Sequence, residues 1–145
     1  MNVYADSSFF VSTCILDAHT PETSLRLKKH PLIWITSLHR AEVANAIHRY
    51  VFRGAISASE ALAAWKHFDE DCVNGFWIQV DLPIRLWESS IDLARRYGPT
   101  IGVRTLDSLH VACALELKAQ RFWTFDERQA KLAEAVGLDT SPQIP

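Results

Sequence analysis

The chain has 145 residues, of which 48% are hydrophobic and 22% are charged, and its formal net charge is -2 at pH 7. These values are typical of a globular chain large enough for one core, and they exclude a disordered or fibrous protein. The near-neutral charge provides no large basic field for nucleic acid, although acids gathered at one site can mask a basic rim elsewhere. We therefore predict a single domain over residues 1–145.

The cysteines and the N-terminal residues bear on the compartment. Cys14, Cys72 and Cys113 are odd in number and far apart, which is typical of small core residues in a reducing compartment and not of disulfides or a zinc site. Asp6 interrupts the first apolar run and no basic leader precedes it, so we predict no signal peptide. No apolar stretch approaches the ~20 residues that cross a bilayer. We predict a cytoplasmic protein without membrane contact.

Short β-prone runs alternate with helical patterns along the chain. In chain order we predict a strand at residues 3–5, a helical region at 9–29 broken near Pro21, a strand at 32–35, helices at 38–53 and 58–72, a strand at 76–80, a helix from about 83 to 97, a helix at 105–119, a strand at 121–124, a helix at 127–136 and a short edge strand at 138–141. This alternation is typical of a parallel sheet of four to five strands with helices on both faces. The predicted fold class is α/β.

Four acids stand at positions where such a fold brings side chains together. Asp6 follows the first strand, Asp126 follows the strand at 121–124, Asp107 lies in the first turn of a helix, and Glu42 interrupts an alanine-rich helix. Ligands of open α/β sheets bind beyond the carboxyl ends of the strands. Four neighbouring carboxylates cannot all stay ionised without a cation, and hard oxygen ligands suit Mg²⁺ or Mn²⁺. The pattern predicts a metal site for phosphodiester hydrolysis.

Each acid also has a simpler structural interpretation when it is taken alone. Asp6 and Asp126 are good helix caps, and Asp107 favours the dipole of its helix. Glu42 can be a solvated helix residue. The functional interpretation therefore depends on whether the fold brings the four acids together.

The ordered motifs resemble those of the PIN-domain family. They are Asp6–Ser7–Ser8 after the first strand, Glu42, Leu106–Asp107–Ser108–Leu109–His110–Val111–Ala112, and Thr124–Phe125–Asp126. The likeness covers essentially the whole chain and is closest to the VapC-like toxins of bacterial toxin–antitoxin pairs. It implies a three-layer α/β/α fold with sheet order 3-2-1-4-5 and metal-dependent endoribonuclease activity. It also implies a cognate antitoxin protein as partner and a homodimer.

The resemblance implies that four acids are both metal ligands and catalytic residues: Asp6, Glu42, Asp107 and Asp126. The last of them often contributes through water in this family. One or two Mg²⁺ or Mn²⁺ ions would orient a scissile phosphate of RNA and activate a water, so no side-chain nucleophile is required. The products would carry a 5′-phosphate and a 3′-hydroxyl. An alternative stays open, namely a PIN-like binding or assembly module with little or no nuclease activity.

Three further residues are candidates for supporting roles at this site. Ser8 occupies a place where the family often has a hydroxyl, and Thr124 either supports the site or only packs. His110 follows Asp107 by three positions, so both can share one helix face and the histidine can orient that carboxylate. The other interpretation of His110 is a histidine packed under the site with a backbone partner.

Two other histidines and two aromatic residues are predicted to lie outside the chemistry. His39 and His48 flank Glu42 on the same helix, and their spacing matches no zinc motif. We interpret both histidines as rim or surface residues. Trp65 and Phe68 have helical spacing, which is typical of core residues or of a face that meets a second copy or an antitoxin helix.

Overall fold

The structure is a computed structural model and describes residues 1–142. Its elements in chain order are β1 (Asn2–Ala5), α1 (Ser7–Cys14), α2 (Thr20–Leu27), β2 (Leu32–Ile35), α3 (Ser37–Phe52), α4 (Ala58–Val73), β3 (Ile78–Gln79), α5 (Leu86–Ile101), α6 (Thr105–Glu116), β4 (Arg121–Trp123) and α7 (Glu127–Ala135). The strands form one parallel sheet in the order β3-β2-β1-β4. The predicted α/β class and the order 3-2-1-4 are confirmed, and within residues 1–142 there is no fifth strand.

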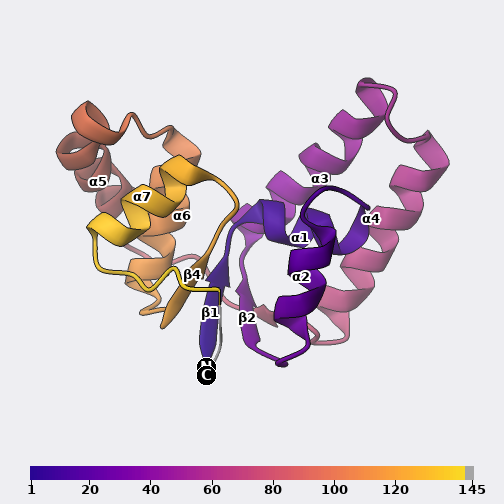
Figure 1. The fold of residues 1–145 in the computed structure, drawn as a ribbon, viewed down its shortest axis with the longest axis horizontal. Coiled ribbons are helices and arrows are strands. Elements are labelled where there is room, and N and C mark those ends of the chain that lie inside the picture. Colours follow the sequence, from indigo (N-terminus) through magenta and orange to yellow (C-terminus); the bar gives the residue numbers. More distant parts are fainter. Residues whose placement is uncertain (143–145) are drawn as a thin grey trace.

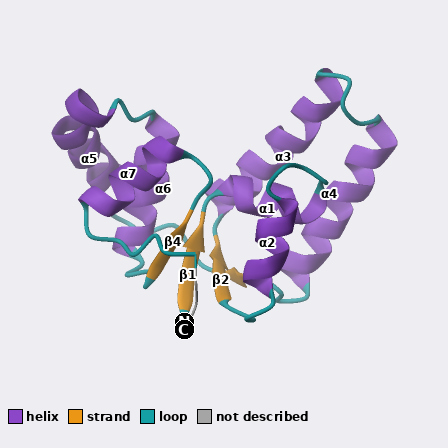
Figure 2. Ribbon diagram, in the orientation of Figure 1, coloured by secondary structure: helices purple, strands orange, loops and turns teal. Residues whose placement is uncertain are grey.

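Helices cover both faces of the sheet, which makes three layers (Figures 1 and 2). The side chains of a strand alternate between its two faces. Val3 and Ala5 of β1 therefore belong to a core cluster shared with α1, α3 and α4, whereas Tyr4 belongs to a second cluster shared with α5, α6 and α7. Each cluster buries one face of the sheet, so both faces of β1 are covered. No helix among residues 1–142 has the length and apolar composition needed to span a bilayer.

The central position of β1 brings the ends of two distant strands together. β1 pairs with β2 on one side and with β4 on the other, and Ala5 lies opposite Trp123. One residue further on, the Asp6 amide donates to the Trp123 carbonyl at 2.9 Å. Residues that follow β1 and β4 therefore leave the same edge of the sheet.

The predicted helix after residue 83 begins and ends later than its sequence signals suggested. Asp81 and Pro83 stand before a turn, closed by the Leu86 amide donating to the Pro83 carbonyl, and α5 begins at Leu86. The helix then continues through Pro99 to Ile101. It ends at Gly102, whose φ of 69° is in the left-handed region and whose amide donates to the Gly98 carbonyl at 3.0 Å. Glycine terminates helices in this way because it has no Cβ to oppose positive φ.

The predicted edge strand at 138–141 is wrong, although its residues lie against β4. One backbone hydrogen bond joins them to the strand, from the Phe122 amide to the Asp139 carbonyl at 2.8 Å. The Ser141 carbonyl instead accepts from two side chains, the guanidinium of Arg121 and the indole of Trp123. Residues 138–141 are thus joined to β4 mainly by side-chain donors and not by the backbone hydrogen bonds of a strand pair. The predicted strand at 76–80 is likewise shortened to Ile78–Gln79.

Candidate functional site

Four acids from four separate segments line one open cavity of about 630 Å³ at the carboxyl edge of the sheet. Asp6 follows β1, Asp126 follows β4, Asp107 lies in the first turn of α6, and Glu42 lies on α3. Asp6 and Asp107 are nearly buried, with 5% and 2% of their surfaces exposed. The fold therefore brings together all four acids that the sequence singled out.

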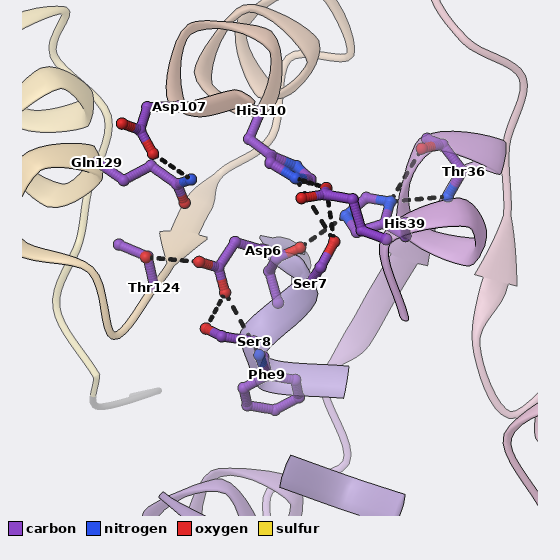
Figure 3. Close-up of polar contacts among 12 residues, drawn as sticks. Asp6, Ser7, Ser8, Phe9, Thr36, His39, Asp107, His110, Thr124 and Gln129 are labelled. Atoms are coloured by element: carbon purple, nitrogen blue, oxygen red, sulfur yellow. Dashed lines mark hydrogen bonds and ion pairs between the residues drawn. The ribbon is translucent and has the colours of Figure 1, made fainter. Parts of the chain in front are cut away.

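Asp6 is a buried carboxylate held by neutral donors (Figure 3). As the N-cap of α1, its Oδ1 accepts from the Ser8 hydroxyl at 2.6 Å and from the Phe9 amide at 3.3 Å. Its Oδ2 accepts from the Thr124 hydroxyl at 2.8 Å, and that hydroxyl in turn accepts from the Asp126 amide at 2.9 Å. Burial raises the pKa of Asp6, although these hydrogen bonds and nearby His110 oppose the increase. The two predicted supporting hydroxyls both contact Asp6.

Asp107 and Asp126 share one basic side chain, that of Arg104. Its Nη2 donates to Asp126 Oδ2 at 2.9 Å, and its Nε donates to Asp107 Oδ2 at 3.3 Å. The Arg104 backbone amide donates to the same Asp107 oxygen at 2.9 Å, because Asp107 caps its own helix. The hydrogen bond to Asp107 is the main cause that raises the pKa of Arg104. Gln129 also reaches Asp107, at 3.4 Å between its Nε2 and Oδ1.

Glu42 is held by His110 and Ser7 instead of by a basic side chain. His110 Nε2 contacts Glu42 Oε1, and the Ser7 hydroxyl donates to the same oxygen at 2.8 Å. Burial keeps the pKa of Tyr4 well above its usual value, so its hydroxyl stays neutral, and this hydroxyl lies 2.8 Å from His110 Nδ1. Because an ionised carboxylate can only accept, Nε2 is the nitrogen that donates toward Glu42. The two interpretations of His110 therefore need correction, because its partners are Glu42 and Tyr4 and neither Asp107 nor a backbone group.

His39 lies in the interior, so its interpretation as a rim or surface residue is wrong. It is 0% exposed, its Nδ1 accepts from the Thr36 amide at 3.0 Å, and its Nε2 donates to the Ala5 carbonyl at 2.8 Å (Figure 3). Burial, helped by neighbouring His110, lowers the pKa of His39 well below 6.5. The ring therefore ties the start of α3 to the end of β1. His48 is exposed, as predicted.

Phe68 is fully buried in the core and Trp65 is partly buried beside it. Phe68 is therefore a core residue that cannot meet a partner.

Sequence reasoning missed several residues that contact the four acids or, in one case, the histidine that holds Glu42. They are Tyr4, Ser7, Arg104 and Gln129. Arg104 and Ser7 stand beside motif acids, and Gln129 has the spacing of a cap partner for Asp126, so proximity in sequence was a usable signal for these three. Tyr4 had no such signal, because its role depends on the face of β1 from which its hydroxyl extends.

The donor chemistry of the cavity fits a hard divalent cation. Its four acids offer carboxylate oxygens, which Mg²⁺ and Mn²⁺ prefer. Asp6 has no arginine or lysine partner among residues 1–142, so a buried carboxylate there lacks a fixed counter-charge. In the described part of the chain, no three acidic, histidine or cysteine side chains lie close enough together to hold one metal ion in their present positions. Each carboxylate is held by its own protein donors, and some of these would have to give way to a cation.

The PIN domain family model matches residues 3–135 of this sequence. The chain belongs to the PIN domain family. This membership agrees with the parallel sheet order and with the acids at the carboxyl edge. No curated protein matches the sequence.

Three solved structures are similar in fold to this chain. VapC20 of Mycobacterium tuberculosis, a sarcin–ricin loop cleaving toxin, has a TM-score of 0.70 and 16% identity, with 99% of each chain covered. FitAcB from Neisseria gonorrhoeae has a TM-score of 0.72 and 11% identity, with 97% of each chain covered. VapBC2 from Rickettsia felis, bound to a DNA fragment from its promoter, has a TM-score of 0.65 and 14% identity, covering 97% of this chain and 98% of that chain. At these identities the likeness shows that the PIN fold extends over nearly the whole length of each chain.

Proposed function

We propose that this PIN domain is a divalent-metal-dependent endoribonuclease and the toxin of a toxin–antitoxin pair. The observation that carries the proposal is the convergence of Asp6, Glu42, Asp107 and Asp126 on one open cavity of about 630 Å³. An open cavity whose acids would hold a cation suits an extended substrate with phosphates better than a small apolar ligand, because apolar ligands are bound in enclosed, mainly hydrophobic pockets. The description of VapC20 as a sarcin–ricin loop cleaving toxin supports RNA as the substrate class.

In this proposal the chain binds Mg²⁺ or Mn²⁺ with its four acids. The ion would polarise the scissile phosphate and activate water for hydrolysis. The residues around the acids have positioning roles. Thr124 and Ser8 fix the two oxygens of Asp6, and His110 with Ser7 fixes Oε1 of Glu42. No histidine is assigned as a general base.

An aromatic stack on the wall of the cavity suits the bases of single-stranded RNA. The exposed ring of His19 lies flat on Phe125, with ring centroids 4.1 Å apart and an angle of 4° between the planes. Phe125 continues the stack inward to Phe9, with centroids 6.5 Å apart. Both His19 and Phe125 line the cavity that holds the acids. Unpaired RNA bases bind to exposed aromatic rings by such stacking.

Two partners belong to the proposal. A cognate antitoxin would inhibit the enzyme, in line with the VapBC2 neighbour. A homodimer is supported by an exposed apolar row around the start of α5, formed by Ile84, Trp87 and Ile91, which are 100%, 62% and 52% exposed. Apolar rows of this kind mark interaction sites. The free cysteines are consistent with the predicted cytoplasmic location.

A second candidate function is a binding or assembly module without catalysis. It is favoured by the way each acid is already held by protein donors, so that no three of the described side chains surround one ion. Under this alternative the hydrogen bonds around Asp107 and Glu42 would be permanent structural contacts, and added metal would not change the protein.

A cleavage assay distinguishes the two functions. Purified protein, shown to be free of antitoxin, is incubated with total RNA in Mg²⁺, in Mn²⁺ and in EDTA, beside Asp6→Asn and a control variant, Asp92→Asn. Asp92 is an exposed acid on α5 whose ion-pair partner is Arg96. We expect cleavage that requires the metal, is lost in Asp6→Asn and persists in Asp92→Asn. Absence of cleavage in every condition would favour the binding module.

A further inference from the structure

Arg104 occupies the oxygens through which Asp107 and Asp126 would bind a cation. Its guanidinium contacts both acids, at 2.9 Å to Asp126 Oδ2 and at 3.3 Å to Asp107 Oδ2. Its Nη2 also lies 3.5 Å from the second oxygen of Asp107. A guanidinium is a permanent cation with several fixed donors, so it can hold two carboxylates at once.

The hydrogen bonds of Asp107 leave no room for another cation. A carboxylate has about four acceptor positions, two on each oxygen. Oδ2 accepts from the backbone amide and from Nε of Arg104, and Oδ1 accepts from Nη2 of Arg104 and from Gln129. A divalent ion can therefore bind Asp107 only if one of these donors leaves.

The Arg104 side chain is the donor best able to leave. The backbone amide is fixed by the start of α6, and Gln129 is buried, with 4% of its surface exposed. The Arg104 side chain is 62% exposed and lines the open cavity. The Arg104–Asp126 pair is largely solvent-exposed, with 62% and 34% of the two side chains exposed, and such pairs contribute only about 0.2–1 kcal/mol. Asp107 is buried, so a cation that displaces Arg104 has to replace the positive charge beside that carboxylate.

We propose that Arg104 is a displaceable internal counter-ion, which holds Asp107 and Asp126 in the metal-free protein and withdraws from them when a divalent cation binds. Once released, the guanidinium faces the same cavity and is available to the phosphates of the substrate, with which arginine forms charge-assisted hydrogen bonds. This inference rests on the metal dependence in the proposed function. It adds that metal binding to Asp107 and the Arg104–Asp107 contacts exclude each other.

The test measures the dissociation constant of Mn²⁺ by isothermal titration calorimetry, without RNA, for the wild type, Arg104→Ala and Arg104→Gln. The matched control is Arg49→Ala. Arg49 lines a neighbouring hollow with Glu42 but makes no ion pair among residues 1–142. We expect both Arg104 variants to bind Mn²⁺ about fivefold more tightly, which corresponds to the loss of one competing exposed ion pair. Arg49→Ala should bind like the wild type, because the Arg49 guanidinium forms no ion pair with any of the four acids in the described chain.

A second measurement follows Arg104 itself in the wild type. Modification by phenylglyoxal, read by peptide mass spectrometry, should increase at Arg104 when Mn²⁺ is added and stay constant at Arg49. Equal Mn²⁺ affinity in the wild type and the Arg104 variants, or an equal gain in Arg49→Ala, would overturn the proposal even if the wild type cleaves RNA. If neither the wild type nor any variant bound Mn²⁺, both the proposed metal dependence and the proposed role of Arg104 would be wrong.

Discussion

The imidazole of His110 contacts the carboxylate of Glu42 across 68 positions of the sequence, while Tyr4 fixes the other nitrogen of the ring. Because Glu42 has no arginine or lysine partner among the described residues, this contact and the Ser7 hydroxyl set the direction of its side chain. Second-sphere hydrogen bonds of this kind commonly change metal affinity or activity by about 10–100-fold.

We therefore expect His110→Ala to lower both Mn²⁺ affinity and the rate of RNA cleavage by about 10–100-fold. Tyr4→Phe should cause a smaller loss in the same direction, because it keeps the imidazole but removes the bond that selects its tautomer. Calorimetry and cleavage assays measure the two effects, and His48→Ala, at an exposed position of α3, is the control. A purely structural role for His110 would predict loss of folding by circular dichroism without a specific loss of metal affinity in the folded fraction.

Asp6→Asn should stabilise the metal-free protein although it abolishes cleavage. Asp6 is 5% exposed and accepts only from two hydroxyls and an amide, so its charge is buried without a basic partner. We expect the free energy of unfolding in EDTA to rise by about 0.5–2 kcal/mol, the usual gain from removing one such defect. Urea unfolding at pH 7 measures it. Added Mg²⁺ should stabilise the wild type but not the variant, and a less stable variant in EDTA would contradict the prediction.

His39 should make the folded protein less stable in mild acid. Its pKa is lowered well below 6.5 in the folded state, so the unfolded chain takes up the proton first. The contribution of His39 is therefore fully present above about pH 6.5 and is lost as the pH falls toward the folded pKa, at up to about 1.4 kcal/mol per pH unit.

Urea unfolding of the wild type and His39→Gln at pH 7.5, 6.5 and 5.5 checks this sign. The variant should be less stable at pH 7.5, because it loses the ring nitrogen that accepts from the Thr36 amide. Its stability should fall less steeply as the pH is lowered. The wild type and the variant share all other titrating groups. The difference between them in how the free energy of unfolding changes with pH therefore reports on His39. Identical slopes would show that another group causes the acid sensitivity.

His19→Ala should weaken the binding of single-stranded RNA if the proposed function is correct. A base stacked on an aromatic ring contributes about 1–3 kcal/mol, so we expect a loss of about tenfold in affinity. Fluorescence anisotropy of a labelled oligonucleotide in the inactive Asp6→Asn background measures it. His19→Phe should restore binding, and His67→Ala, an exposed histidine on α4, should leave it unchanged. If His19→Ala bound the oligonucleotide with wild-type affinity, the stacked rings of His19 and Phe125 would not be part of the RNA-binding surface.

The order of the strands and the meeting of the four acids could be predicted from the sequence because both follow from backbone topology. Acids that follow β1 and β4 meet wherever those strands are neighbours. The partners of the acids depend on side-chain directions, which spacing does not determine. His110 and Asp107 share a helix, yet the Asp107 carboxylate turns back to the amide of Arg104 and leaves His110 to reach α3. Similarly, His39 follows a polar pattern but fills the space between β1 and α3.

Three consecutive residues of one short segment each serve a different part of the site. The Tyr4 hydroxyl serves His110, the Ala5 carbonyl receives His39, and Asp6 contributes its own carboxylate. A shift of register by one residue would exchange the two faces of β1 and undo all three contacts at once. A deletion within residues 2–5 should therefore be far more harmful than an insertion in the loop between α2 and β2. The segment with the least freedom to vary in length is thus one of the shortest in the fold.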